Sequence, residues 1–179
     1  MKWVITILFL VATVTLQAQV FKTVSAKVSL SDVYDSISVG VESHGMYIIL
    51  NYDRAQMDMK MSLRSIVTTN DTLNNQIQNS PEQVFHFTGK MRLDYVRTKT
   101  HPTQKFPVNG MLTINGISHP FSFNAILYHI ANSGDAACKL SGQMSIDISK
   151  YFPDASFNRF DDKVVLSFSQ IVLKKPGEL

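Results

Sequence analysis

Cysteine is nearly absent from this sequence, because Cys138 is the only one among 179 residues. The chain therefore cannot form an intramolecular disulfide, and its folded state must depend on a hydrophobic core. Cys138 also lies far from the N-terminus, which excludes a lipid-anchoring cysteine at that end. No catalytic partner is recognisable in the sequence, so we interpret Cys138 as a small, half-buried residue at the start of a strand.

Charge is scarce as well. Charged residues make up 17% of the chain, and the formal net charge is only +3. Lysine and arginine are scattered, which excludes the basic stripe that is typical of proteins that bind nucleic acid. The hydrophobic share of 45% excludes wholesale disorder, and the length suits one domain with a core of its own.

Motifs for catalysis or metal binding are missing. The five histidines are His44, His86, His101, His119 and His129, and none pairs with another ligand type at a metal-site spacing. The sequence has no Gly-x-Ser-x-Gly elbow, no Walker loop and no dinucleotide fingerprint. We therefore predict no catalytic residue, no metal and no cofactor, and we expect His86 to point to solvent.

A long hydrophobic run occurs only at the N-terminus. A lysine at position 2 precedes the apolar residues 4–16, and "LQAQ" follows them. This order predicts a secretory signal peptide over residues 1–18, with cleavage after Ala18 or Gln19, because the run is short for a membrane span. A retained N-terminal anchor is the alternative. The remaining residues, 19–179, are predicted to form one domain that is periplasmic or secreted.

What the sequence does contain is a two-residue alternation. In "MDMKMSLR", Met57, Met59, Met61 and Leu63 alternate with polar or charged residues. This period is typical of a β-strand with one buried face and one solvent-exposed face. The three methionines and the leucine are therefore predicted either to pack in a core or to line a cavity that holds an apolar molecule.

The rest of the chain also indicates strands. The methionine-containing range 57–66 is predicted as one strand. The other ranges predicted as strands are 20–30, 36–41, 46–52, 84–91, 140–149, 163–173 and the two runs on either side of Asn115–Gly116. Asn-Gly favours a type I′ hairpin turn, and Pro120 should lie at an edge, a strand start or a bulge. Between residues 68 and 81 we expect one short helix with Asn70 or Asp71 as its N-cap and Pro81 at its end, or else a plain loop.

These signals predict an all-β fold. The sequence indicates about eight strands and one short helix, without the alternation of strands and helices that is typical of βαβ units. This pattern favours an antiparallel sheet that closes into a barrel. The interior of such a barrel is wide enough to be filled by side chains or to hold one small ligand.

Several segments of the chain, and the order in which they follow one another, resemble those of the YceI-like proteins. "FPVNGMLTINGISHPFSFNAIL" is similar to the family's strand, turn and strand signature through Gly110, Leu112, Thr113, Ile114, Gly116, Pro120, Phe121 and Phe123. "PEQVFHFTGKM" and "LSGQMSIDISKYFPD" resemble further family segments, and the whole resemblance covers residues 46–173. It implies a lipocalin-like barrel, exported to the periplasm, with a long isoprenoid chain held inside.

A set of apolar residues at alternating positions is predicted to line the barrel. The candidates are Met57, Met59, Met61, Leu63, Phe85, Phe87, Leu112, Ile114, Phe121, Phe123, Met144, Ile146, Leu166 and Phe168. For any one of them, plain core packing is the competing interpretation. Tyr151, Phe152, Phe157 and Phe160 are predicted to lie at the mouth of the barrel, or else to pack on its outside.

The functional hypothesis is a non-catalytic, exported binder of an amphiphilic lipid, a polyisoprenoid in particular. Its predicted partner is an isoprenoid or other lipid ligand, without nucleic acid or metal, and the protein is a monomer or a homodimer. The alternative is a structural or interaction protein whose barrel is filled and whose loops contact a partner at the cell surface.

Overall fold

The computed structural model describes residues 20–22, 26–34, 37–51, 54–93, 102–132, 134, 136–153 and 163–173. The predicted signal peptide lies outside these residues. The described strands are β1 (Val20–Lys22), β2 (Ala26–Tyr34), β3 (Ile37–Asn51), β4 (Gln56–Ser62), β5 (Ile66–Thr68), β6 (Val84–Met91), β7 (Gln104–Ile114), β8 (Ile117–His129), β9 (Ala136–Asp147) and β10 (Lys163–Leu173). A helix, α1 (Asp71–Asn79), and two 3₁₀ turns, η1 (Leu63–Ser65) and η2 (Ile148–Lys150), complete the described elements.

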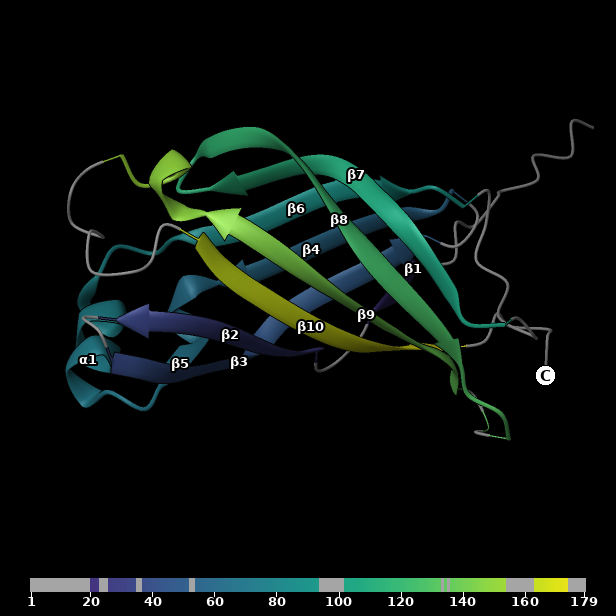
Figure 1. Cartoon of the computed structure of the whole chain (residues 1–179), viewed down its shortest axis with the longest axis horizontal. Coiled ribbons are helices and arrows are strands. Elements are labelled where there is room, and N and C mark those ends of the chain that lie inside the picture. Colours follow the sequence, from purple (N-terminus) through teal and green to yellow (C-terminus); the bar gives the residue numbers. More distant parts are fainter. Residues whose placement is uncertain are drawn as a thin grey trace, which may run out of the picture.

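Eight of the described strands form a closed ring. Antiparallel pairing runs from β3 through β2, β10, β9, β8, β7 and β6 to β4, and β4 pairs again with β3. The short strands β1 and β5 pair with β3 beside this ring. Figure 1 shows the tilted strands wrapping around a common axis, with α1 at one end. The predicted antiparallel β-barrel of about eight strands with one helix is therefore confirmed.

β3 is a single long strand where the sequence indicated two. Ala26 of β2 pairs with Met46 of β3, whereas Val28 pairs with Ser43, so β3 carries one extra residue at this point. Such a β-bulge reverses the faces of a strand, and Ser43 and Met46 are both buried as a result. Gly45 lies in the bulge, where a Cβ atom would collide with the side chain of Ser65. The two-residue alternation of buried and exposed side chains is interrupted here. The pattern in one half of the strand therefore does not predict the pattern in the other half.

The helix confirms the expectation for residues 68–81. Asn70 is the N-cap, and its side-chain oxygen accepts a hydrogen bond of 3.0 Å from the Leu73 backbone N–H. Leu73 is buried against Val41 in a small cluster separate from the barrel core. The helix ends before Ser80, and Pro81 follows it.

One predicted strand is shorter than expected. The range 57–66 was expected as one strand, but β4 ends at Ser62, and Leu63 belongs to the 3₁₀ turn η1. Leu63 is half-buried and packs against the edge of the barrel core. The prediction that Leu63 continues the buried face of the methionine strand is therefore wrong in its geometry. The Leu63 N–H still donates to the Gln83 carbonyl, in line with the register of β4 and β6. The chain leaves the strand direction just after this bond, in η1, where the Ile66 N–H donates to the Leu63 carbonyl.

The hairpin between β7 and β8 forms as predicted. Asn115 and Gly116 have φ angles of +53° and +76°, the left-handed values that a type I′ turn requires. Pro120 pairs with Met111 of β7, whereas the pairing of β8 with β9 begins only at Asn124. At Pro120, β8 therefore has a partner strand on one side only. A proline is tolerated there, because its missing N–H removes no hydrogen bond between strands.

The hydrophobic core lies on the inside of the ring. Six methionines, Met46, Met57, Met59, Met61, Met91 and Met144, belong to one cluster together with phenylalanines, leucines, isoleucines, valines and alanines from the inner faces. Among the described residues, no helix is both long and apolar enough to cross a membrane.

Candidate functional site

The inner face of the barrel holds nearly all the residues predicted as lining. Twelve of the fourteen are at most 7% exposed: Met57, Met59, Met61, Phe85, Phe87, Leu112, Ile114, Phe123, Met144, Ile146, Leu166 and Phe168. Phe121 and Leu63 are half-buried and pack against this cluster. The structure thus brings the candidates together, and their contact with a ligand stays a prediction.

Strand register separates the two faces of the wall. Met59 of β4 lies directly opposite Phe87 of β6 on the inner face. On the outer face, the Asp58 carboxylate Oδ2 lies 3.0 Å from Nε2 of His86, and both side chains are about two-fifths exposed. His86 therefore points away from the core, as expected. The alternation read in the sequence identifies which side chains face inward.

Phenylalanine rings form a connected layer inside the barrel. The ring of Phe87 meets that of Phe123 edge-to-face at a centroid distance of 5.3 Å, and Phe123 meets Phe168 at 5.7 Å. Phe121 extends the layer, 6.4 Å from Phe87. These rings come from β6, β8 and β10, and edge-to-face contacts stabilise such pairs beyond simple burial.

Glycines in the wall make room for this layer. A Cβ atom on Gly110 would fall against the Thr88 carbonyl oxygen, 2.5 Å from the Gly89 Cα atom and 2.8 Å from Cζ of Phe87. A Cβ atom on Gly142 would lie 2.7 Å from two ring carbons of Phe168. Sequence reasoning missed this role. The available signal was that both glycines occupy inward positions of alternating strands.

The methionines form the other notable part of the interior. Met46 and Met91 were not among the predicted lining residues, yet each is only 2% exposed and belongs to the same cluster. Methionine is unbranched and adapts to irregular space, so this part of the interior can change shape more readily than a core of branched residues.

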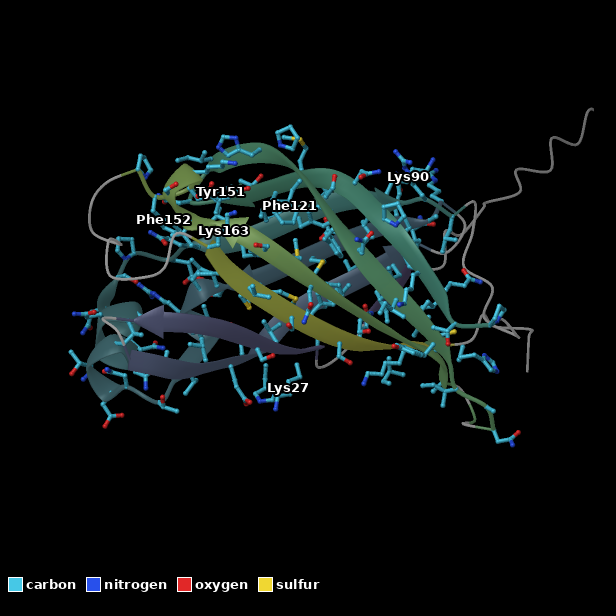
Figure 2. All side chains as sticks on the ribbon, viewed as in Figure 1. Lys27, Lys90, Phe121, Tyr151, Phe152 and Lys163 are labelled. Atoms are coloured by element: carbon cyan, nitrogen blue, oxygen red, sulfur yellow. The ribbon has the colours of Figure 1, made fainter. Side chains whose placement is uncertain are left out.

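One end of the barrel has a seam in its wall. β9 pairs with β8 only up to Gln143 and Asn124, although both strands continue towards η2. Just beyond η2, the buried ring of Tyr151 stacks edge-to-face on His119 of β8 at 5.3 Å. Figure 2 shows Tyr151 and Phe152 at the same end of the barrel as Lys163, where β10 begins.

Two of the four aromatic residues predicted at the mouth, Tyr151 and Phe152, lie at this end of the barrel. Tyr151 belongs to the buried cluster, and Phe152 packs against it, so both contact the interior of the barrel. Burial raises the pKa of the Tyr151 hydroxyl above its usual range, and the charge of Asp147 adds to the shift, so this group stays neutral. Phe157 and Phe160 lie outside the described residues. The role of these aromatic residues as a mouth stays a prediction.

A single glutamine interrupts the apolar inner face of β10. Gln170 is 3% exposed and follows Phe168 at the next inward position. Its Nε2 donates a hydrogen bond of 3.3 Å to the backbone carbonyl of Ile48. Sequence reasoning missed Gln170, although the break in the alternation of "VVLSFSQIVL" was visible.

Cys138 is fully buried in β9, not half-buried as expected. Burial raises the pKa of its thiol from 9.0 to about 12. Because only the thiolate reacts, alkylation of the folded protein by iodoacetamide at pH 8 should be roughly a thousandfold slower than that of the unfolded chain. Mass spectrometry of timed samples, with and without guanidinium, checks this rate ratio. Equal rates would show that the thiol is accessible.

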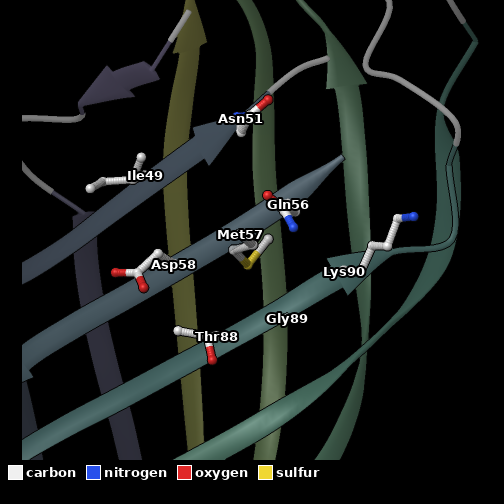
Figure 3. A pocket seen from close by; sticks show the side chains of 8 residues that line it. All are labelled: Ile49, Asn51, Gln56, Met57, Asp58, Thr88, Gly89 and Lys90. Carbon is white, nitrogen blue, oxygen red and sulfur yellow. The ribbon is translucent and has the colours of Figure 1, made fainter. Parts of the chain in front are cut away.

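Two marked hollows lie on the part of the outer face that the structure describes. The larger, of about 640 Å³, is bordered by Ile49, Asn51, Gln56, Met57, Asp58, Thr88, Gly89 and Lys90, which belong to β3, β4 and β6 (Figure 3). The second, of about 450 Å³, lies over β4, β6 and the hairpin turn at Asn115. Apolar groups, among them those of Ile49 and Met57, border the larger hollow together with polar and charged side chains, and polar or charged side chains border most of the second.

Metal-binding groups do not converge in the part of the chain that the structure describes. No group of three or more histidine, cysteine, aspartate or glutamate side chains there has the arrangement of a metal site. The buried, inward-facing residues are almost entirely apolar. The arrangement can therefore remove apolar surface from water, and the described residues offer no acid–base pair for chemistry inside the barrel.

Comparison with known proteins agrees with the fold. The YceI-like domain model matches residues 9–171 of the chain. No curated protein matches the sequence. Among solved structures, BcnA of Burkholderia cenocepacia is similar with a TM-score of 0.60 and 16% identity, over 82% of this chain and 96% of that one.

Two further structures share the same fold. A polyisoprenoid-binding domain from Saccharophagus degradans, implicated in plant cell wall breakdown, has a TM-score of 0.61 and 10% identity, covering 86% of this chain and 96% of that one. The YceI protein of Campylobacter jejuni has a TM-score of 0.56 and 18% identity, covering 75% of this chain and 84% of that one.

Proposed function

The chain belongs to the YceI-like domain family, and from this premise we propose that it is a non-catalytic binding protein that holds an amphiphilic lipid, a polyisoprenoid in particular, inside its barrel. The observation that carries the proposal is the closed ring of eight strands whose inner face is apolar almost throughout.

The driving force for binding is the transfer of apolar surface out of water. Each Å² of apolar surface that the ligand buries contributes about 25 cal/mol. A long isoprenoid or acyl chain has many such Å² and no polar groups along its length, which suits walls made of methionine, phenylalanine, leucine and isoleucine. Selectivity then depends on the length of the interior and on the few polar groups near the chain.

The composition of the interior supports adaptation to a guest. Met57, Met59 and Met61 on β4 contribute side chains with several rotatable bonds, which can move aside at little cost. The phenylalanine layer is more rigid, because each ring moves as one unit. A ligand that threads the barrel displaces methionine side chains before it displaces aromatic rings.

The identity of the ligand rests on likeness in fold. The Saccharophagus degradans domain is a polyisoprenoid-binding domain, and at 10% identity it shares the barrel with this chain but few side chains. A polyisoprenoid is the first candidate for this reason. Export to the periplasm or beyond is part of the proposal, and the apolar run at residues 4–16 supports it.

Organic extraction tests the proposal. Protein purified from its own host should release a stoichiometric polyprenyl or acyl species that mass spectrometry identifies. The matched control is an unrelated exported protein of similar size, purified and extracted in the same way. A clean extract, together with no uptake of added lipid, would instead favour a filled barrel that acts through its loops.

A further inference from the structure

Gln170 carries a buried oxygen atom without a partner. The buried polar side chains of the described residues are Ser43, Thr68 and Gln170. Ser43 bonds to Ser65, and the Thr68 hydroxyl donates to the Asn70 carbonyl. Gln170 is 3% exposed, yet its Oε1 has no hydrogen-bond partner. Such an atom calls for an explanation, because leaving a buried acceptor unpaired is unfavourable.

The orientation of the amide follows from its neighbour. Nε2 of Gln170 lies 3.3 Å from the Ile48 carbonyl oxygen and donates to it. The opposite assignment would place two acceptor oxygens together, so Oε1 must be the free atom. Oε1 therefore remains as an acceptor that can receive a hydrogen bond but cannot give one.

The surroundings of Gln170 are those of the apolar interior. Phe168 and Val172 are its inward neighbours along β10, and both are buried. Across the ladder, Gln170 pairs with Leu140 of β9, which in turn pairs with Leu127 of β8. Both leucines are at most 1% exposed. Gln170 thus lies in the same interior as the phenylalanine layer, one inward position beyond Phe168.

The chemistry of this site limits the guest. An acceptor requires a donor, and an ionised phosphate or carboxylate has none. No lysine or arginine is buried among the described residues, so nothing there would compensate an anion drawn into the barrel. A neutral hydroxyl supplies the missing donor without bringing a charge.

We propose that Gln170 Oε1 accepts a hydrogen bond from a hydroxyl group on the bound lipid, so that the barrel selects a neutral apolar chain that bears an alcohol. The inference rests on the proposed function, because it requires the chain to lie inside the barrel. The hydroxyl end lies at the level of Gln170, and the apolar remainder extends past Phe168 towards the phenylalanine layer. A buried water molecule is the competing partner for the same atom.

A matched pair of probes tests this proposal on the whole protein. Farnesol has the hydroxyl, and farnesyl methyl ether has the same chain without the donor. We expect the wild type to bind farnesol roughly tenfold more tightly than the ether by isothermal titration calorimetry, the factor that corresponds to one net hydrogen bond of about 1.4 kcal/mol.

Two variants assign the preference to its residue. Gln170→Met removes the acceptor at nearly constant volume, and it should bind both probes equally. Gln143→Met makes the same change at an exposed position of β9, where Gln143 bonds only to Ser167 on the outer face, and it should keep the tenfold preference. A preference that survives in Gln170→Met would overturn the proposal.

The remaining outcomes are also decisive. Equal binding of both probes by the wild type would overturn the Gln170 inference, assign the atom to water, and leave the proposed function intact. Binding of neither probe would count against both. If Gln170→Met does not fold, the ¹³C resonance of the Gln170 amide carbonyl in the wild type provides the measurement. It should shift with farnesol but not with the ether, and no shift would overturn the inference.

Discussion

Met59→Lys should destabilise the barrel strongly and prevent it from loading lipid. Met59 is fully buried, opposite Ile48 of β3 and Phe87 of β6. An ammonium group there has no partner and no water, so we expect the free energy of unfolding to fall by roughly 4 kcal/mol or more. For a domain of this size that is a fall in Tm of about 10 °C, measured by circular dichroism or calorimetry.

The adjacent residue provides the matched control. Lys60 is exposed on the outer face of the same strand, and Lys60→Met should change the free energy of unfolding by less than about 0.5 kcal/mol. Met59→Leu keeps the volume and the polarity, and it should cost less than about 1.5 kcal/mol. Equal tolerance of lysine at position 59 and methionine at position 60 would show that the faces of β4 are wrongly assigned.

The loading result separates stability from function. If Met59→Lys still folds, its extract should lack the lipid that the wild type carries, because the charge lies among the methionines that would contact the ligand. Lys60→Met should load normally. A folded Met59→Lys protein with a full complement of lipid would contradict binding inside the barrel.

Gly110→Ala is the second change for which we expect a large effect. The added methyl group would fall against the Thr88 carbonyl oxygen and close to the Gly89 Cα atom, both of which are backbone. Gly89 and Gly110 pair directly across β6 and β7, so relief requires the two strands to move apart. We expect a loss of about 3 kcal/mol in the free energy of unfolding, measured by denaturant titration.

Gly40→Ala tests whether this cost belongs to the site or to any glycine in a strand. A Cβ atom on Gly40 would meet only the Thr69 side chain, at 3.3 Å. The change should lie within about 1 kcal/mol of the wild type, since alanine also reduces the freedom of the unfolded chain. Comparable losses at both positions would mean that the close approach at Gly110 does not hold in solution.

The two predictions test different properties of the barrel interior. Met59 tests what fills the barrel, and Gly110 tests the wall that leaves room for the Phe87 ring. A barrel that tolerates neither change has an interior whose shape and polarity are both constrained, which a selective apolar site requires.

Much of the candidate site could be predicted from local pattern. Two-residue alternation identified the inner faces of β4, β6 and β10, and the structure buries Met57, Phe85 and Leu166 accordingly. The Asn-Gly pair predicted the hairpin, and Asn70 was one of two residues expected to cap the helix. Each of these signals acts over a few residues, which is the range at which sequence pattern is reliable.

Two features of the strands were missed. Leu63 leaves the strand direction in η1, where the Ile66 N–H donates to the Leu63 carbonyl and the Ser65 hydroxyl bonds to Ser43 of β3, which is distant in sequence. The bulge lies where β3 pairs with β2 on one edge and with β5 and β4 on the other. Gly45 was a local signal for it, because a glycine inside a strand often marks a bulge, but the pairing itself depends on distant strands.

The sequence by itself determined which side chains are apolar, where apolar and polar residues alternate and where the chain turns, because those properties depend on neighbours along the chain. Only the tertiary structure decided that β4 closes on β3, that Phe87, Phe123 and Phe168 meet, and that the amide oxygen of Gln170 is left unpaired among them. These facts depend on the register between strands that are far apart in sequence, and register is set by the packing of the whole ring.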